Sequence, residues 1–162
     1  MTRLDVPVSL RWSDLDAYGH VNNVAMLTLL EEARIEVFWR HPVISEESAV
    51  TGWPTAVIDA GPGAETSTLV AGQHVEYLRP LAYRRHPVIV VLWIGRLGGA
   101  SLDICYEVRD VPAGQDGVTY ARAVTTLVLV DSTTGSPRRI GQAERAAWEP
   151  FVEEPVVLRR SR

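Results

Sequence analysis

The N-terminal part of the chain changes from one hydrophobic pattern to another. Residues 5–12 alternate between polar and apolar side chains, and a period of two residues is typical of a strand with one buried face. Residues 24–39 lack this alternation, and their first half, VAMLTLL, is apolar on nearly every side. The pattern predicts a helix that begins enclosed by other structure and ends, with its charged second half, in water. His41-Pro42 should end it, because the residue before a proline avoids the helical conformation.

The remainder of the chain is patterned mainly as strands separated by turn residues. We expect strands at residues 55–60, 69–79 with a bulge at Gly72, 88–97, 100–109 and 118–131. Residues 88–97 are apolar on both faces, which is typical of a central strand, and Gly98-Gly99 predicts a tight hairpin after them. Residues 43–52 should be irregular, with room for a short helical turn. A short helix is expected at residues 142–149 and a loosely held tail from residue 152.

This order of elements predicts an α+β fold. One strand, one long buried helix and a meander of further strands place the helix on one face of an antiparallel sheet of five to six strands. With 162 residues the chain fits one domain, which we assign to residues 1–151, with residues 152–162 as the tail. The helix is more apolar than one sheet face requires, so we expect two such units to associate.

Composition excludes several classes of function. A net charge of −4 gives no reason to expect nucleic acid as a partner. All 16 basic residues are arginine, which excludes Schiff-base chemistry through lysine. Cys105 is the single cysteine and is expected to be a structural thiol. The four histidines are not part of an HExxH motif and no CxxC motif accompanies them, so we expect no metal site. The N-terminus does not resemble a signal peptide and no apolar run could span a bilayer, so we expect a cytoplasmic protein without a membrane partner.

Polar groups crowd residues 13–22, the polar loop, between the first strand and the helix. Asp16 is the leading candidate for chemistry, because the field at a helix N-terminus keeps a nearby carboxylate ionised. Exposed N–H groups of that terminus, or of a neighbouring one, can polarise a carbonyl oxygen, so the pair could act on an acyl carbon. The alternative interpretation is that Asp14 and Asp16 only form Asx turns and helix-entry hydrogen bonds, which are common.

Other polar residues of the loop and the helix also have both a functional and a structural interpretation. His20 could orient a carboxylate or donate to a leaving group, or it could simply bond to backbone. Asn22 and Asn23 could bind water or a carbonyl, although one of them should be the N-cap. Glu31 and Glu32 are rival bases if buried, and otherwise part of a solvated, arginine-paired face.

The run DLDAYGHVNN, followed by an apolar helix ending in EEAR, resembles the signature of the 4-hydroxybenzoyl-CoA thioesterase family of hotdog-fold proteins. The resemblance is greatest to acyl-CoA thioesterases with a D-x-D-x-x-G-H-V-N-N loop. VEYLRPL at residues 75–81 is similar to the family's central strand, and TGSPRRI at residues 134–140 to its last. The resemblance implies a hotdog fold, in which a curved antiparallel sheet wraps one long central helix. It also implies a homodimer or homotetramer with the active site at a subunit interface.

The same resemblance implies hydrolysis of an acyl-coenzyme A thioester, with coenzyme A as part of the substrate and no other cofactor. Asp16 corresponds to the family's nucleophile or general base, and a helix N-terminus would polarise the thioester carbonyl. Met26 stands where many relatives carry an aromatic residue, which leaves the acyl group open. The expected catalytic residues are Asp16, His20 and Asn23, and the expected substrate-binding residues are Gly19, Val21, Asn22, Met26, Arg96, Arg138 and Arg139, the arginines meeting the phosphates.

Three alternatives to an acyl-CoA thioesterase stay open. A hotdog hydratase or dehydratase would resemble a D-x-N-P-x-H pattern, from which the spacing of Asp16 and His20 differs. A hotdog module could bind acyl groups without turnover. An acyl carrier protein could replace coenzyme A, although an acidic carrier favours a basic entrance, which the net charge of −4 does not predict.

Overall fold

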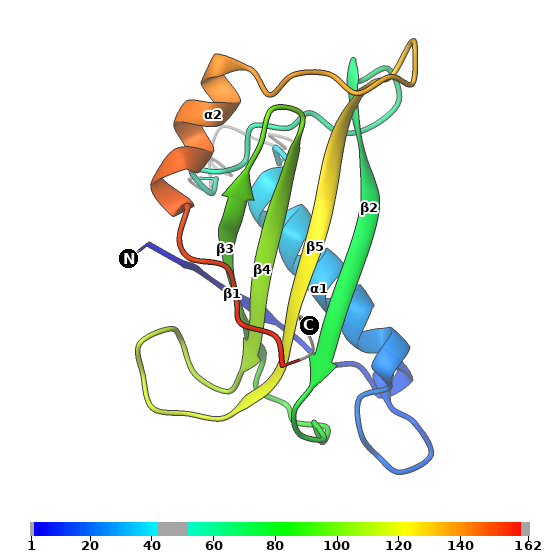
Figure 1. Ribbon diagram of the computed structural model, residues 1–162. Coiled ribbons are helices and arrows are strands. Elements are labelled where there is room, and N and C mark those ends of the chain that lie inside the picture. Colours follow the sequence, from blue (N-terminus) through cyan, green and yellow to red (C-terminus); the bar gives the residue numbers. More distant parts are fainter. Residues whose placement is uncertain (1, 42–51, 160–162) are drawn as a thin grey trace, which may run out of the picture.

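The computed structural model describes residues 2–41 and 52–159 of the chain. In these residues five strands form one antiparallel sheet in the order β1-β3-β4-β5-β2, so β1 and β2 are the edges. Helix α1 lies across one face of the sheet, and α2 lies near one end (Figure 1). The elements are β1 Leu4–Val8, the 3-10 helix η1 Trp12–Asp14, α1 Asn23–Phe38, β2 Thr66–Tyr77, β3 Val88–Leu97, β4 Ser101–Arg109, β5 Thr119–Asp131, α2 Gln142–Trp148 and the 3-10 helix η3 Glu149–Phe151.

The sequence pattern is confirmed for the α+β class and for most elements. Strand β3 has the predicted bounds, and β4, β5 and α1 differ from prediction by one residue at most at each end. The register of β2 against β5 shifts between Val70 and Gly72, where the bulge was expected. The wrapping of a long central helix is not confirmed, since α1 has 16 residues and lies on one face of the sheet.

Two predicted strands are corrected. The first strand ends at Val8 instead of Trp12, because its partner β3 begins at Val88 and the chain then turns into η1. Residues 55–60 form no strand; their single ladder contact is a bridge between Ile58 and Trp39. Isolated bonds to the end of α1 hold this segment instead: the Thr55 hydroxyl donates to the Val37 carbonyl, and the Ile58 N–H donates to the Phe38 carbonyl at 3.1 Å. Of the expected irregular segment 43–52, residues 43–51 lie outside the described residues.

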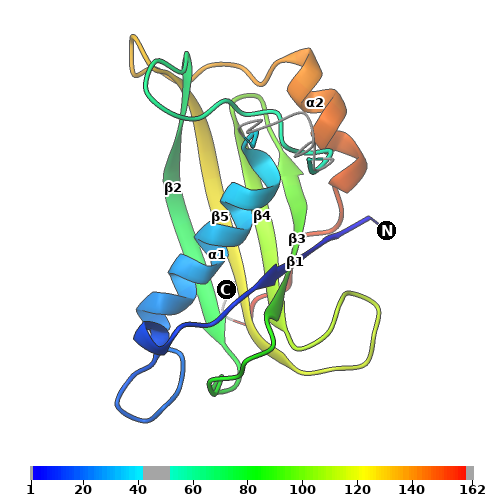
Figure 2. The same ribbon diagram turned by 180° about the vertical axis from the view of Figure 1, so that it is seen from behind.

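The core lies between α1 and the sheet face that we call inner. Leu30, Ala33 and Val37 on the helix are fully buried, as are Leu92 and Ile104 on the sheet. Each buried aliphatic side chain of this size contributes about 1.5–3 kcal/mol. This packing fixes the direction of α1, so its N-terminus lies beside the end of β2 (Figure 2). Neither α-helix in the described part of the chain has both the length and the apolar character needed to cross a bilayer.

The segment after η3 crosses the outer face of the sheet (Figures 1 and 2). We expected a loose tail from residue 152, yet the Glu153 N–H donates to the Ile94 carbonyl at 2.9 Å and the Trp93 indole N–H to the Glu154 carbonyl at 2.9 Å. This segment covers Cys105, which is fully buried, and burial raises the pKa of its thiol. A buried neutral thiol is the structural thiol that the sequence indicated.

Candidate active site

The first aspartate of the polar loop holds the loop together. Asp14 is 1% exposed, and its carboxylate accepts from the Arg11 backbone N–H at 2.7 Å and from the Arg11 guanidinium at 2.9 Å. Its carbonyl accepts from the Asn22 N–H at 2.7 Å. Because these bonds join the two ends of the loop, Asp14 has a structural role.

The second aspartate is held through one oxygen only. Asp16 Oδ1 accepts from the backbone N–H groups of Tyr18 at 2.8 Å and His20 at 3.2 Å. Gly19 makes this turn possible with a φ of 75°, which favours glycine. Asp16 Oδ2 accepts no hydrogen bond from any described residue. The Asx-turn interpretation is therefore correct for Oδ1, and Oδ2 is available to another molecule.

Free backbone N–H groups lie at the start of α1, where Asn23 lines the same cavity as Asp16. Asn22 is the N-cap of α1: its side chain accepts from the Val24 N–H at 2.8 Å and its carbonyl from the Met26 N–H at 2.9 Å. The first N–H groups of a helix have no partner within it. In the described part of the chain, Asn23 and Ala25 therefore keep unpaired N–H groups at the positive end of the helix.

A cavity of about 360 Å³ joins the polar loop, the first turn of α1 and the end of β2. The Tyr77 hydroxyl donates to the Asn23 carbonyl at 2.7 Å, and the Val21 N–H donates to the Leu81 carbonyl at 2.7 Å, so both walls are fixed. The cavity is lined by Asp16, His20, Val21, Asn23, Met26, Tyr77, Leu78, Arg79, Pro80 and Leu81. Five of these are predicted site residues.

Tyr77 and Arg79 line the cavity but were not predicted as site residues. Both belong to VEYLRPL, where the alternation indicated only a strand. Burial raises the pKa of the Tyr77 hydroxyl, which therefore stays neutral and able to donate. Arg79 is exposed and is the one arginine in the cavity lining. Its position two residues after the end of β2 was the available signal.

The rival glutamates do not line this cavity. Glu32 faces a larger cavity, of about 480 Å³, between β1 and α1, whose lining contains none of the predicted site residues. The Glu31 side chain is 56% exposed and lies 3.5 Å from the Arg34 guanidinium, which fits a solvated helix face. No three His, Cys, Asp or Glu side chains of residues 2–41 and 52–159 gather closely enough to hold a metal ion.

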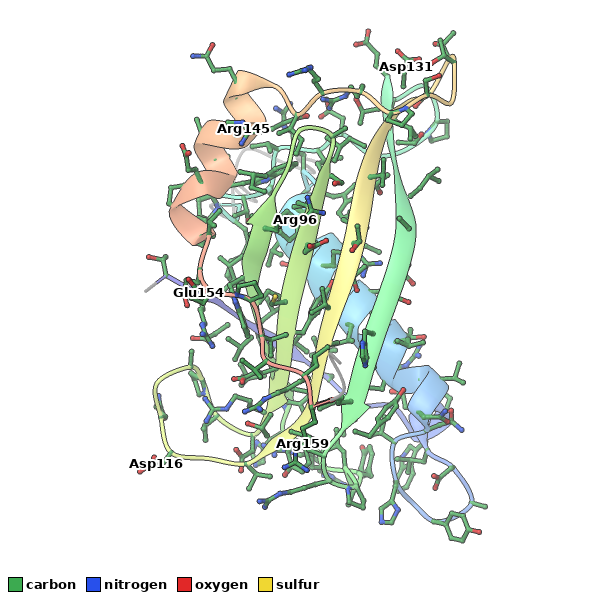
Figure 3. All side chains as sticks on the ribbon, in the orientation of Figure 1. Arg96, Asp116, Asp131, Arg145, Glu154 and Arg159 are labelled. Carbon is green, nitrogen blue, oxygen red and sulfur yellow. The ribbon has the colours of Figure 1, made fainter. Side chains whose placement is uncertain are left out.

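The predicted phosphate-binding arginines lie far from Asp16 in the same chain. Asp131, the residue nearest to Arg138 and Arg139 that is labelled in Figure 3, is at its upper end, and the polar loop is at the lower end. Arg96 lies nearer the middle of the sheet, at the level of Gly72 in β2 and three strands away from it. The 12 residues of β2 connect the two ends and span roughly 36–40 Å at about 3.3 Å per residue. The structure thus does not bring Arg96, Arg138 and Arg139 together with the cavity of the same chain.

Two of these arginines are already paired. The Arg96 guanidinium donates to both Asp103 oxygens, at 2.7 and 3.2 Å. Arg138 donates to Thr66 at 2.7 Å and to Glu144, and the bond to Glu144 raises the pKa of Arg138. Arg139 has an exposed side chain.

The five-stranded sheet with one helix on its inner face, and a polar loop and cavity at the N-terminus of that helix, define a hotdog-fold protein. Residues 10–156 match the family model of the Thioesterase-like superfamily. The chain belongs to this family, which supports activity as a thioester hydrolase.

Two solved structures and one relative are similar to the chain. A predicted thioesterase from Bacillus stearothermophilus has a TM-score of 0.69 at 23% identity, over 96% of this chain and 100% of that one. A thioesterase from Thermus thermophilus, solved with coenzyme A and Zn, has a TM-score of 0.63 at 28% identity, over 92% of each chain. YsmA from Bacillus subtilis (strain 168) is 35% identical over 100 residues, which are 61% of this chain and 56% of YsmA. The match thus spans little more than half of that relative.

Proposed function

We propose that the chain hydrolyses an acyl-coenzyme A thioester to a free acid and coenzyme A, with Asp16 as the essential carboxylate. One observation carries the proposal: Asp16 Oδ2 is free in the same cavity that Asn23, at the positive end of α1, also lines. A free carboxylate next to unpaired N–H groups matches the needs of acyl transfer. The coenzyme A bound by the Thermus thermophilus protein supports the choice of carrier.

Asp16 Oδ2 can act in either of two ways. As a general base it takes a proton from water while the water oxygen attacks the carbonyl carbon. As a nucleophile it attacks that carbon itself and forms an anhydride, which water then hydrolyses. In both cases the carbonyl oxygen becomes negative and the free N–H groups of the first turn of α1 stabilise it. The C–S bond then breaks and the thiolate takes a proton, for which His20 in the cavity lining is the proposed donor. His20 regains a proton from Asp16 in the general-base route, or from the water that hydrolyses the anhydride in the nucleophile route, so the water supplies both the hydroxyl of the acid and the proton of the thiol.

We also propose a homodimer formed through β2. This strand pairs with β5 on one side only, and Leu69 and Val70 on it are 55% and 47% exposed. An exposed apolar edge is a surface that proteins normally cover. Two β2 strands paired antiparallel about a two-fold axis would bring the Thr66 end of one beside the Tyr77 end of the other. Contact of Arg96, Arg138 or Arg139 with substrate stays a prediction that depends on such a partner.

The test is release of free thiol from a panel of acyl-coenzyme A thioesters by the wild type and by Asp16→Asn. Asparagine keeps the oxygen that accepts from Tyr18 and His20, so the loop should survive. We expect turnover to fall about 100-fold or more, as for loss of a catalytic acid or base. Asp116→Asn, an exposed change in the β4–β5 loop, is the matched control and should leave turnover unchanged.

The other outcomes separate the alternatives. Near-full activity of Asp16→Asn would refute Asp16 as the essential group. Release from an acyl carrier protein but from no acyl-coenzyme A would change the substrate. Acyl binding without release from either would indicate a module without turnover.

A further inference from the structure

We propose that Trp12, Tyr83, Arg84 and Arg85 form the binding surface for the nucleotide end of the substrate, the adenosine phosphates of coenzyme A. The proposal rests on the proposed function, whose site lies in the adjacent cavity. Residues 78–87, which we call the arginine loop, connect β2 to β3 and carry Tyr83 and both arginines. Trp12 belongs to η1, immediately before the polar loop turns toward Asp16.

The arginine loop is joined to the polar loop at two points and to Trp12, directly before that loop, at a third. The Val21 N–H donates to the Leu81 carbonyl at 2.7 Å, and His20 forms a backbone bridge with Ala82. Trp12 and Tyr83 stack with ring centroids 4.3 Å apart and planes 15° from parallel. The arginine loop, through Leu78 to Leu81, thus forms one wall of the cavity that Asp16 lines.

The stacked pair is a rigid surface with one open face. Tyr83 covers one face of the indole, yet Trp12 is 74% exposed, so its other face is in water. The bonds between Arg11 and Asp14 fix the backbone on which Trp12 sits. Aromatic side chains of this kind stack with nucleic-acid bases, because every base has a planar π-face. An adenine ring is the planar group that coenzyme A can supply.

The charges of the arginine loop fit the phosphates of the same ligand. Arg79 lines the cavity, and Arg84 and Arg85 follow Tyr83 directly. The Arg84 Nε donates to the His86 carbonyl at 3.2 Å, which leaves its outer nitrogens for a ligand, and Arg85 is exposed. Among the described residues none of these three arginines forms an ion pair, in contrast to Arg96 and Arg138. Arginine forks bind phosphate in bidentate geometry.

The distances suit a thioester in the cavity and a nucleotide outside it. Trp12 and Asp16 are four residues apart, so their Cα atoms are at most about 14 Å apart. The pantetheine arm of coenzyme A separates the thioester from the phosphates, so the phosphates cannot share the cavity with the carbonyl. The arm can leave past Arg79 and Pro80 and place the nucleotide on the stacked pair. An acyl carrier protein has no adenine, so this surface favours coenzyme A as the carrier.

The test compares an acyl-coenzyme A with the same acyl group on pantetheine, which has neither adenine nor nucleotide phosphates. For Trp12→Ala, and separately for Arg84→Ala with Arg85→Ala, we expect KM for the acyl-coenzyme A to rise about tenfold or more. KM and kcat for the acyl-pantetheine should stay unchanged, which also shows that the variants fold. Trp12→Phe should retain most of the affinity, because it keeps an aromatic face. Arg40→Ala, an exposed arginine just beyond the other end of α1, is the control.

Equal effects on both substrates, or no effect on either, would overturn the proposal. Binding of adenosine 3′,5′-bisphosphate to the wild-type protein, measured by calorimetry, supplies a second readout that needs no turnover. Binding that the double arginine variant loses supports the surface even if no thioester is hydrolysed. Absence of binding, together with unchanged KM values, would direct attention to the arginines of a second chain.

Discussion

Replacing Asp14 by alanine should destabilise the protein without removing its chemistry. The Asp14 carboxylate is buried and accepts from the Arg11 backbone N–H at 2.7 Å, which resembles a helix N-cap bond. Loss of such a bond typically costs about 0.5–2 kcal/mol. The second bond comes from the Arg11 guanidinium, which is exposed to water, so we assign it no contribution to the free energy of unfolding.

The expected shift can be measured directly. For a chain of this size, 1 kcal/mol corresponds to roughly 2–4 °C in Tm, so Asp14→Ala should lower Tm by about 1–8 °C. Asp14→Asn keeps an oxygen for the Arg11 N–H and should lose less. Thermal unfolding followed by circular dichroism gives Tm, and thiol release well below Tm gives turnover, which should stay within a few-fold of wild type. Asp16→Asn should show the reverse pattern, with a Tm close to that of wild type and a large loss of turnover.

Two results would refute this division of roles. An unchanged Tm for Asp14→Ala would mean that the bond to Arg11 does not stabilise the loop. A loss of turnover as large as that of Asp16→Asn, in a variant that is still folded, would mean that Asp14 also acts on the substrate.

Two further predictions concern the edge strand and the pH dependence of stability. Val70→Asp adds a charge to the exposed edge of β2, so the variant should be a monomer by light scattering. The control Val157→Asp, in the C-terminal segment where Val157 is 80% exposed, should leave the dimer intact. A Val70→Asp protein that is still a dimer would place the interface elsewhere. Burial alone would raise the pKa of Glu144, but hydrogen bonds from Arg138 and the Gly141 N–H lower it below 4.5. The stabilising contribution of the Glu144 carboxylate is therefore fully present above pH 4.5 and is lost as the pH falls through its lowered pKa. In urea unfolding, the free energies of unfolding of wild type and Glu144→Gln should converge in acid and diverge at neutral pH.

The elements that the sequence predicted well are those whose hydrophobic pattern directly reflects which of their faces are covered. Strand β3 is apolar on both faces because α1 covers one and the C-terminal segment covers the other, and its predicted bounds are correct. The prediction of a strand at residues 55–60 was wrong for the opposite reason. They have the composition of a strand, but side-chain bonds to α1 and α2 hold them, and no local pattern encodes those partners.

The residues of the candidate site that could be predicted from the sequence are those that come from one continuous segment. Asp16, His20, Asn23 and Met26 share the cavity because they lie within one loop and the helix turn that follows. Tyr77 and Arg79 come from a strand more than fifty residues later, and only the packing of α1 on the sheet brings them in. Arg96 and Arg138 could not be judged from sequence, since the carboxylates that pair with them become neighbours only through the β3–β4 hairpin and the start of α2.

The two interpretations of Asp16, a turn-forming residue and a catalytic one, are not exclusive. A carboxylate has two oxygens, and Tyr18 and His20 both donate to Oδ1. These two bonds fix the side chain, so the entropy of orienting Oδ2 is lost during folding instead of during the reaction. In the proposed function, the Asx turn in the loop before α1 would therefore prepare the Asp16 carboxylate for chemistry, and the spacing of Asp16, Gly19 and His20 is what that turn requires. The same reasoning explains why Asp14, with both oxygens engaged by Arg11, cannot take its place.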